Sequence, residues 1–293
     1  MINQKISLFI LILYVAAACT GPGPVLRIGL VADPQYQDKD PAGKRYYRES
    51  LWKLEQAIDT FNFYDVDFIQ NLGDIIDRGW ESFDSILPVY GKVNPGTEIY
   101  HLLGNHDFAV DSALMPGLLS RLGMPDDYYS YVNQGWRFIV LNSMDCSFLA
   151  NPLYKRDSSV ISSYYNATIG KPNHYDWNGA IGEDQQEWLR GELKEAESQD
   201  QQVIVFSHMP LLPEDVEERL WNAEEILEIL EASPVVRAYI NGHRHKGAYA
   251  FHNGIHYISI FGMVDTMVSS YAIIEIYGDE IKLKGFGNQI SNY

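Results

Sequence analysis

Residues 67–77 read DFIQNLGDIID, and residues 98–107 read EIYHLLGNHD. Each stretch is a short apolar run followed by a glycine and a group of polar side chains. Such runs are typical of buried β-strands, because turn-forming residues bound them and they are too short for helices. We therefore expect Asp74 and Asn105 to stand just beyond the ends of two strands.

The same arrangement recurs along the chain, with apolar runs at 25–32, 203–206 and 235–240 that also end in polar residues. In open α/β sheets, ligands bind beyond the carboxyl ends of the strands, so these polar residues should meet in one crevice. The five clusters are Asp33-Pro34-Gln35, Gly73-Asp74, Gly104-Asn105-His106-Asp107, Ser207-His208 and Gly242-His243-Arg244-His245.

Helices are predicted between these strands. Apolar or amphipathic spacing indicates helices at 48–62, 80–92, 183–199 and 223–232. A hairpin is expected at 128–142, and the tail predicts short antiparallel strands at 247–252, 255–260, 270–277 and 280–285. This alternation indicates a layered α/β fold, with residues 25–293 forming a single domain. Residues 144–182 are polar and lack periodicity, which predicts an insertion or lid.

Composition narrows the possible functions. The 293 residues are 46% hydrophobic, which is typical of a globular chain. The net charge of −17 argues against general nucleic-acid binding, which needs a basic surface. The two cysteines cannot form a disulfide framework.

The N-terminus predicts export. Residues 1–18 resemble a lipoprotein-type signal peptide, with Lys5 before an apolar run and small residues before Cys19. In this interpretation Cys19 carries the lipid, residues 19–24 form a short linker, and only the lipid holds the exported protein to the membrane. A plain secretory signal peptide is the alternative.

The clustered side chains offer carboxylate, amide and imidazole groups, which are ligands for manganese, iron or zinc. None of the clusters offers a thiolate, so a closed structural zinc site is not expected. Each cluster alone could be a turn or a structural histidine. However, four of the eight histidines fall in the clusters: His106, His208, His243 and His245.

This ordered set of clusters resembles the calcineurin-like metallophosphoesterases. The resemblance implies a four-layer αββα sandwich, in which two mixed sheets are flanked by helices. Gln35 stands where that family usually has a histidine. Through Gln35 the chain resembles the branch of manganese-dependent ADP-ribose/CDP-alcohol diphosphatases. Further residues carry the same resemblance: Tyr36, Leu220-Trp221-Asn222 and Val264-Asp265-Thr266.

The resemblance, together with ligand chemistry, implies two divalent or mixed-valence metal ions. One ion would be held by Asp33, Gln35, Asp74 and His245, and the other by Asp74, Asn105, His208 and His243. Manganese is favoured because an amide oxygen replaces an imidazole, while iron, magnesium and zinc remain open. A hydroxide shared by the ions would attack phosphorus.

His106 would protonate the leaving oxygen or stabilise charge on the phosphoryl group. Asp77 would orient His106 or a ligand, or merely cap a helix. Tyr36, Arg45 and Arg48 are candidates for binding the substrate, although residues 46–48 could instead begin a surface helix. Aromatic residues of the insertion could close over a ligand or cap the core.

Three functions remain open. The first is hydrolysis of the diphosphate bond of ADP-ribose or CDP-alcohols, with a nucleoside diphosphate derivative as the small phosphorylated substrate. The second is an exported phosphodiesterase or phosphomonoesterase acting on nucleotides or glycerophosphodiesters. The third is a non-catalytic binding lipoprotein. A monomer is expected in each case.

Overall fold

The computed structural model describes residues 23–291. The predicted signal peptide at 1–18, the lipid-bearing Cys19 and most of the predicted linker lie outside these residues, so they remain predictions. Within the described part of the chain, no helix is both long enough and apolar enough to cross a membrane.

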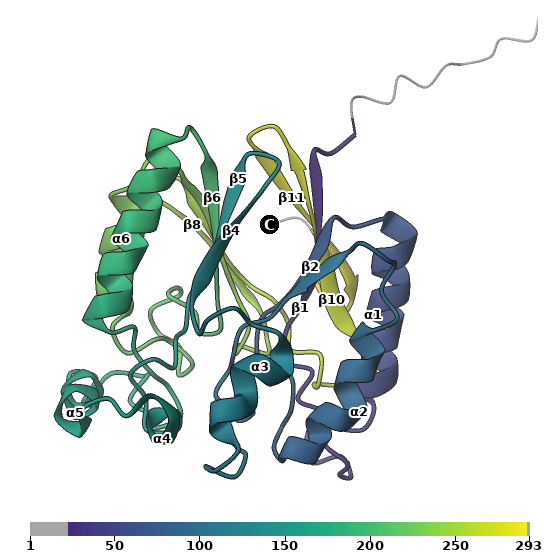
Figure 1. The fold of residues 1–293 in the computed structure, drawn as a ribbon, viewed down its shortest axis with the longest axis horizontal. Coiled ribbons are helices and arrows are strands. Elements are labelled where there is room, and N and C mark those ends of the chain that lie inside the picture. Colours follow the sequence, from purple (N-terminus) through teal and green to yellow (C-terminus); the bar gives the residue numbers. More distant parts are fainter. Residues whose placement is uncertain (1–22, 292–293) are drawn as a thin grey trace, which may run out of the picture.

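Within residues 23–291, eleven strands form two mixed sheets that face each other (Figure 1). The first sheet has the order β11-β10-β1-β2-β3, and the second has the order β4-β5-β6-β7-β9-β8. The bounds in the first are β1 Leu26–Val31, β2 Phe68–Asn71, β3 Glu98–Tyr100, β10 Ser270–Tyr277 and β11 Glu280–Gly287. In the second they are β4 Tyr129–Asn133, β5 Trp136–Val140, β6 Gln202–Ser207, β7 Val236–Asn241, β8 Ala248–His252 and β9 Ile255–Ser259.

Helices cover the outer faces of both sheets. Helices α1 (Ser50–Tyr64) and α2 (Trp80–Tyr90) lie outside the first sheet, and α6 (Glu183–Ser198) lies outside the second (Figure 1). Helix α7 (Ala223–Glu231) packs beside α6. The predicted αββα sandwich of two mixed sheets flanked by helices is therefore confirmed.

Helix α1 forms because Leu54, Ile58 and Phe61 recur at helical spacing and are buried together. It ends where Asp65 adopts a left-handed conformation and donates its N–H back to the last turn. The helix approaches β1 closely at Gly29, where an added Cβ would lie 2.9 Å from the Phe61 ring.

Two expectations need correction. The tail strands are not all antiparallel, because β9 pairs in parallel with β7, while β10 and β11 join the first sheet. The insertion at 144–182 contains helices α4 (Asn151–Tyr154) and α5 (Ser158–Asn166), although no helical periodicity was recognised there. Asp157 caps the N-terminus of α5, because its side chain accepts from the Ser159 N–H, and the helix buries Ile161 beside Trp221.

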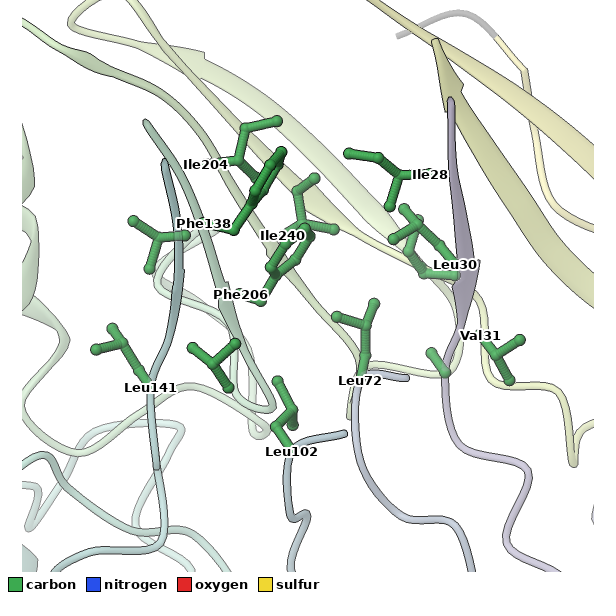
Figure 2. Close-up of a cluster of buried hydrophobic side chains, with 14 of the residues drawn as sticks. Ile28, Leu30, Val31, Leu72, Leu102, Phe138, Leu141, Ile204, Phe206 and Ile240 are labelled. Atoms are coloured by element: carbon green, nitrogen blue, oxygen red, sulfur yellow. The ribbon is translucent and has the colours of Figure 1, made fainter. Parts of the chain in front are cut away.

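The main core lies between the two sheets (Figure 2). Ile28 and Leu30 of β1 face Phe138, Phe206 and Ile240 of the second sheet, and all five are fully buried. Burial of such side chains is the main stabilising contribution to a sandwich of this kind, at about 1.5–3 kcal/mol each.

We predict that Phe138→Ala lowers the free energy of unfolding by about 3–5 kcal/mol, because it leaves a cavity between the sheets. Urea denaturation followed by circular dichroism measures this loss. The matched control is Phe63→Ala in α1, whose ring is 82% exposed, and we expect it to change stability little. Equal losses in the two variants would contradict this account of the core.

A candidate metal centre at the strand ends

Parallel strands bring the predicted ligands to one edge of the sandwich. Asp33 lies two residues past β1, and Asp74 lies three residues past β2. His208 follows β6 directly, and His243 lies two residues past β7. Since β1 pairs in parallel with β2, and β6 with β7, each pair of strands ends at the same edge of its sheet.

Four of the predicted ligands have an unusual backbone conformation. Asp33, Gln35, Asp74 and His243 have φ values of 49°, 43°, 53° and 63°. Residues with a Cβ rarely adopt this left-handed region, and they persist there when surrounding contacts require it. Such contacts are present, because Asp33 carboxylate oxygens accept the His243 N–H at 3.0 and 3.1 Å, and Gln35 N–H donates to Asp74 O at 2.8 Å.

Asp74, His208 and His243 form the centre of the cluster. All three are buried, and one potential ligand atom from each lies within 4.8 Å of the others. His208 Nε2 lies 3.4 Å from Asp74 Oδ2 and 3.2 Å from Asn105 Oδ1. The four ligands predicted for one metal ion are therefore brought together.

The second predicted set also converges on Asp74. Gln35 Nε2 donates to Asp74 Oδ2 at 2.9 Å and lies 3.3 Å from His245 Nε2. His245 Nε2 is 3.5 Å from Asp33 Oδ1. The other amide atom, Gln35 Oε1, is buried and has no hydrogen-bond partner among residues 23–291. A buried acceptor without a partner costs free energy, so this oxygen fits a metal ligand.

Each imidazole has one nitrogen engaged by a neighbouring group, which leaves the other nitrogen for the cluster. The engaged nitrogens are His208 Nδ1, His243 Nε2 and His245 Nδ1. Their partners are Leu72 O at 2.8 Å, Asn178 Oδ1 at 3.2 Å and Asp265 Oδ1 at 2.9 Å. Partners of this kind fix the tautomer and ring orientation of metal-binding histidines.

Charges in the cluster are strongly coupled. Burial opposes protonation of His208, but the charge of Asp74 prevails and raises its pKa to about 9. In the same way, Asp33 and Asp265 raise the pKa of His245 to about 10 against the effect of burial. Burial and the positive charge of His208 lower the pKa of His243 well below its usual value. The buried carboxylates thus require nearby cations, and bound metal ions can replace these protons.

Asp107 joins two of the ligand-bearing loops. Its carboxylate accepts the backbone N–H groups of Asp74, Ile75 and Gly104, each at 2.9 Å. Asp107 therefore has a structural role in the site. It keeps Asp74 and the loop that carries Asn105 at a constant separation.

His106 lies at the border between the cluster and a cavity. Its backbone N–H donates to Asp74 Oδ1 at 2.7 Å, and its Nδ1 lies 3.0 Å from Asp77 O and 3.3 Å from Asp77 Oδ1. Burial opposes protonation of His106, but the charges of Asp74 and Asp77 raise its pKa. The structure therefore places Asp77 where an orienting partner of His106 is needed.

The cavity has a volume of about 680 Å³ and opens over the cluster. Cationic side chains line it together with apolar and acidic ones. The cations are Lys44, Arg45, Arg78 and Lys246, the apolar side chains include Phe108, Leu149 and Trp177, and the acids beyond the cluster are Glu217, Glu218 and Asp265. Leu149 and Trp177 come from the insertion at 144–182.

Of the three predicted substrate contacts, only Arg45 lines this cavity. Tyr36 is buried in the core, and Arg48 pairs with the exposed Asp38 and Asp40 at the surface. Lys44, Arg78 and Lys246 also line the cavity and were not predicted, although Arg78 directly follows Asp77 and Lys246 directly follows His245. It also assigned no role to Asn178 or Asp265.

Two facing mixed sheets with possible metal ligands gathered at their strand ends define a metal-binding αββα sandwich. A model of the calcineurin-like phosphoesterase family matches residues 26–247, so the chain belongs to that family. The chain is an enzyme of this hydrolase class, and the resemblance noted in the sequence is confirmed.

Relatives are similar over nearly their whole length. The manganese-dependent ADP-ribose/CDP-alcohol diphosphatase of Oryza sativa subsp. japonica is 29% identical, over 89% of this chain and 91% of that protein. The protein of the same name from Homo sapiens is 26% identical, over 90% of this chain and 92% of that protein. The crystal structure of a dimetal phosphatase from Danio rerio has a TM-score of 0.79 and 26% identity, covering 92% and 99% of the two chains.

We predict that Gly104→Ala weakens Mn²⁺ binding about 10–100-fold, the range typical of a disturbed ligand environment. An added Cβ would lie 2.2 Å from Asp74 Oδ1 and 2.6 Å from His208 Cε1, so the ligands must shift. Isothermal titration calorimetry measures the affinity. Gly191→Ala in α6 is the control, because its Cβ would meet nothing within 4 Å. Unchanged affinity in Gly104→Ala would refute this geometry.

Proposed function

We propose that this chain is a Mn²⁺-dependent diphosphatase that cleaves the diphosphate bond of ADP-ribose or CDP-alcohols. The products are a nucleoside monophosphate and a phosphorylated alcohol. The observation that carries the proposal is Gln35, whose unpartnered amide oxygen lies in the cluster beside Asp74 and His245. The names of the relatives from Oryza sativa and Homo sapiens support the same substrates.

Two metal ions fit the ligands that share Asp74. Asp33, Gln35 and His245 would hold one ion, and Asn105, His208 and His243 would hold the other. The amide oxygens of Gln35 and Asn105 make the ligand set richer in oxygen, which favours manganese over zinc. When bound, the ions would supply Lewis-acid activation of the phosphate and of an attacking water.

The cationic wall of the cavity suits a diphosphate. Lys44, Arg45, Arg78 and Lys246 line the cavity over the metal cluster, although the whole chain carries a net charge of −17. Arginine forms bidentate hydrogen bonds with phosphate oxygens. A guanidinium nitrogen of Arg45 lies 3.6 Å from Asp77 Oδ1, and this ion pair positions its side chain. These residues would orient the substrate and neutralise the phosphate group farther from the cluster.

An aromatic surface lies beside the same cluster. The Trp177 ring is stacked on Tyr175 at 4.9 Å and contacts the His243 ring edge-to-face at 5.2 Å. A nucleobase can stack on such a surface, since aromatic stacking is worth about 1–3 kcal/mol per base. The predicted insertion would thus contribute to substrate binding as a fixed wall.

His106 would donate a proton to the leaving oxygen. Because Nδ1 is engaged by Asp77, Nε2 is the nitrogen left to act in the cavity. The raised pKa keeps a larger fraction of the imidazole protonated at neutral pH. Proton transfer of this kind typically accelerates a reaction about 10²–10⁴-fold.

The predicted export signal favours a second candidate, a phosphodiesterase or phosphomonoesterase acting on nucleotides or glycerophosphodiesters outside the cytoplasm. The relatives named as diphosphatases do not decide where this chain acts. The two candidate functions need the same metal cluster. They differ in the part of the substrate that contacts the cationic residues of the cavity.

The decisive experiment compares initial rates of metal-stripped protein with Mn²⁺ or Mg²⁺ on ADP-ribose, CDP-choline, AMP and bis(p-nitrophenyl) phosphate. We expect Mn²⁺-dependent cleavage of the first two substrates and no hydrolysis of AMP. Turnover of AMP or the generic diester alone would transfer the function to the second candidate. Binding of two metal ions with no turnover of any substrate would contradict both.

A pH profile tests the proton donor. We predict that Asp77→Asn moves the alkaline limb of kcat to lower pH, because loss of the carboxylate lowers the pKa of His106 and the acid form is lost earlier as pH rises. Asp59→Asn, on the exposed face of α1, is the control and should leave the profile unchanged. An alkaline limb that stays in place in Asp77→Asn would exclude His106 as the acid.

A further inference from the structure

Lys53 is a lysine in an unusual place. It lies on the buried face of α1 and is fully buried, whereas lysines are almost never fully buried unless paired. Within residues 23–291 no carboxylate lies at ion-pair distance from Lys53. Instead, Lys53 Nζ donates to the backbone oxygens of Met263, Val264 and Thr266 at 2.9, 3.3 and 2.7 Å.

The loop at 263–266 is bonded to the first ligand cluster. Met263 N–H donates to Ala32 O, and Val264 N–H donates to Asp33 O, both at 2.9 Å. Asp33 is a predicted ligand in a left-handed conformation. The loop therefore holds part of the turn that follows β1.

The same loop reaches the cationic wall of the cavity. Thr266 N–H donates to Lys44 O, and Tyr46 N–H donates to Val264 O, both at 2.8 Å. Arg45 and Asp265 form an antiparallel bridge between these two segments. Displacement of the loop would therefore move Arg45 as well.

The side chain of Asp265 links the loop at 263–266 to the predicted metal ligand His245. Asp265 Oδ1 lies 2.9 Å from His245 Nδ1, while the carbonyl groups before and after Asp265 accept from Lys53. Thr266 has a φ of 65°, so the backbone turns sharply at this point. An amine has three N–H groups and can satisfy three converging carbonyls, which an apolar side chain would leave buried and unpaired.

We propose that Lys53 is a positioning residue for the metal centre, which holds the loop at 263–266 so that Asp265 orients His245. The inference rests on the proposed two-metal site. Lys53 is not among the residues that line the cavity, and it acts through the backbone of the loop. Burial lowers its pKa to about 8, against the effect of the nearby carboxylates of Glu49 and Asp265.

The test measures Mn²⁺ binding to the full chain by calorimetry, with no substrate present. Lys53→Met should weaken one of two Mn²⁺ sites by about tenfold or more, as expected when a group that orients a ligand is lost. The other site should keep its affinity. Asp265→Asn should reproduce this selective loss, and the double variant should be no worse than either single one.

Arg137→Met is the matched control. Arg137 is also a buried cation, bonded to Gln201 and Glu192, but it lies in β5 near the amino ends of the parallel strands, away from the cluster. This control should lower thermal stability while both Mn²⁺ affinities stay unchanged.

Wild-type Mn²⁺ affinities in Lys53→Met would overturn the proposal. Additive losses of affinity in the double variant would also overturn it. So would a result in which Lys53→Met and Arg137→Met both weaken the two sites equally. If Lys53→Met does not fold, Lys53→Gln replaces it. Glutamine is shorter and cannot reach all three carbonyls, so weakening of one site is again expected, and its absence overturns the proposal. Failure of the wild-type protein to cleave ADP-ribose or CDP-choline would overturn the proposed function alone.

Discussion

The buried carboxylate of Asp74 is the group on which the site depends. It lies where the two sheets approach each other, and it is in contact with Gln35, the His106 backbone and His208. A buried charge without compensation costs several kcal/mol, so the surroundings of Asp74 must supply donors and cations. The strand ends do so, since the polar groups of the cluster follow five strands of the two sheets, β1, β2, β3, β6 and β7. The strands must therefore converge at this edge, because their ends supply the groups that compensate the buried charge of Asp74.

Much of this fold could be predicted because it follows from local pattern. The apolar run at 25–32 became β1 at Leu26–Val31, and the helix expected at 80–92 became α2 at Trp80–Tyr90. Helix α5 was missed for a physical reason: it buries only Ile161, against Trp221 from a distant part of the chain. The parallel pairing of β9 was missed because strand direction depends on nonlocal partners, which residue patterns within a strand do not reveal.

The site shows the same division between local and nonlocal information. The predicted ligands Asp33, Asp74, His208 and His243 could be found because each lies within three residues of a strand end, and a strand end is visible in the sequence. Asp265 and Asn178 reach the cluster through loops whose positions depend on contacts with other segments. Tyr36 was expected to meet substrate because it follows a ligand, but Tyr36 pairs with Ile76 and its side chain is buried in the core. A position near a strand end therefore identifies the ligands, whereas a position next to a ligand does not identify the residues that line the cavity.

The charge distribution explains how an acidic chain can take an anionic substrate. The net charge of −17 repels a diphosphate at long range, but at physiological ionic strength the screening length is about 8 Å. Within that distance the cavity presents Lys44, Arg45, Arg78 and Lys246, while two of its acids, Glu218 and Asp265, are paired with Arg244 and His245. Two of these cations belong to the segment bonded to the loop at 263–266, which also presents Asp265 to His245. Binding of the phosphate and orientation of a metal ligand are therefore linked through one piece of backbone, and the buried amine of Lys53 is the group that holds it.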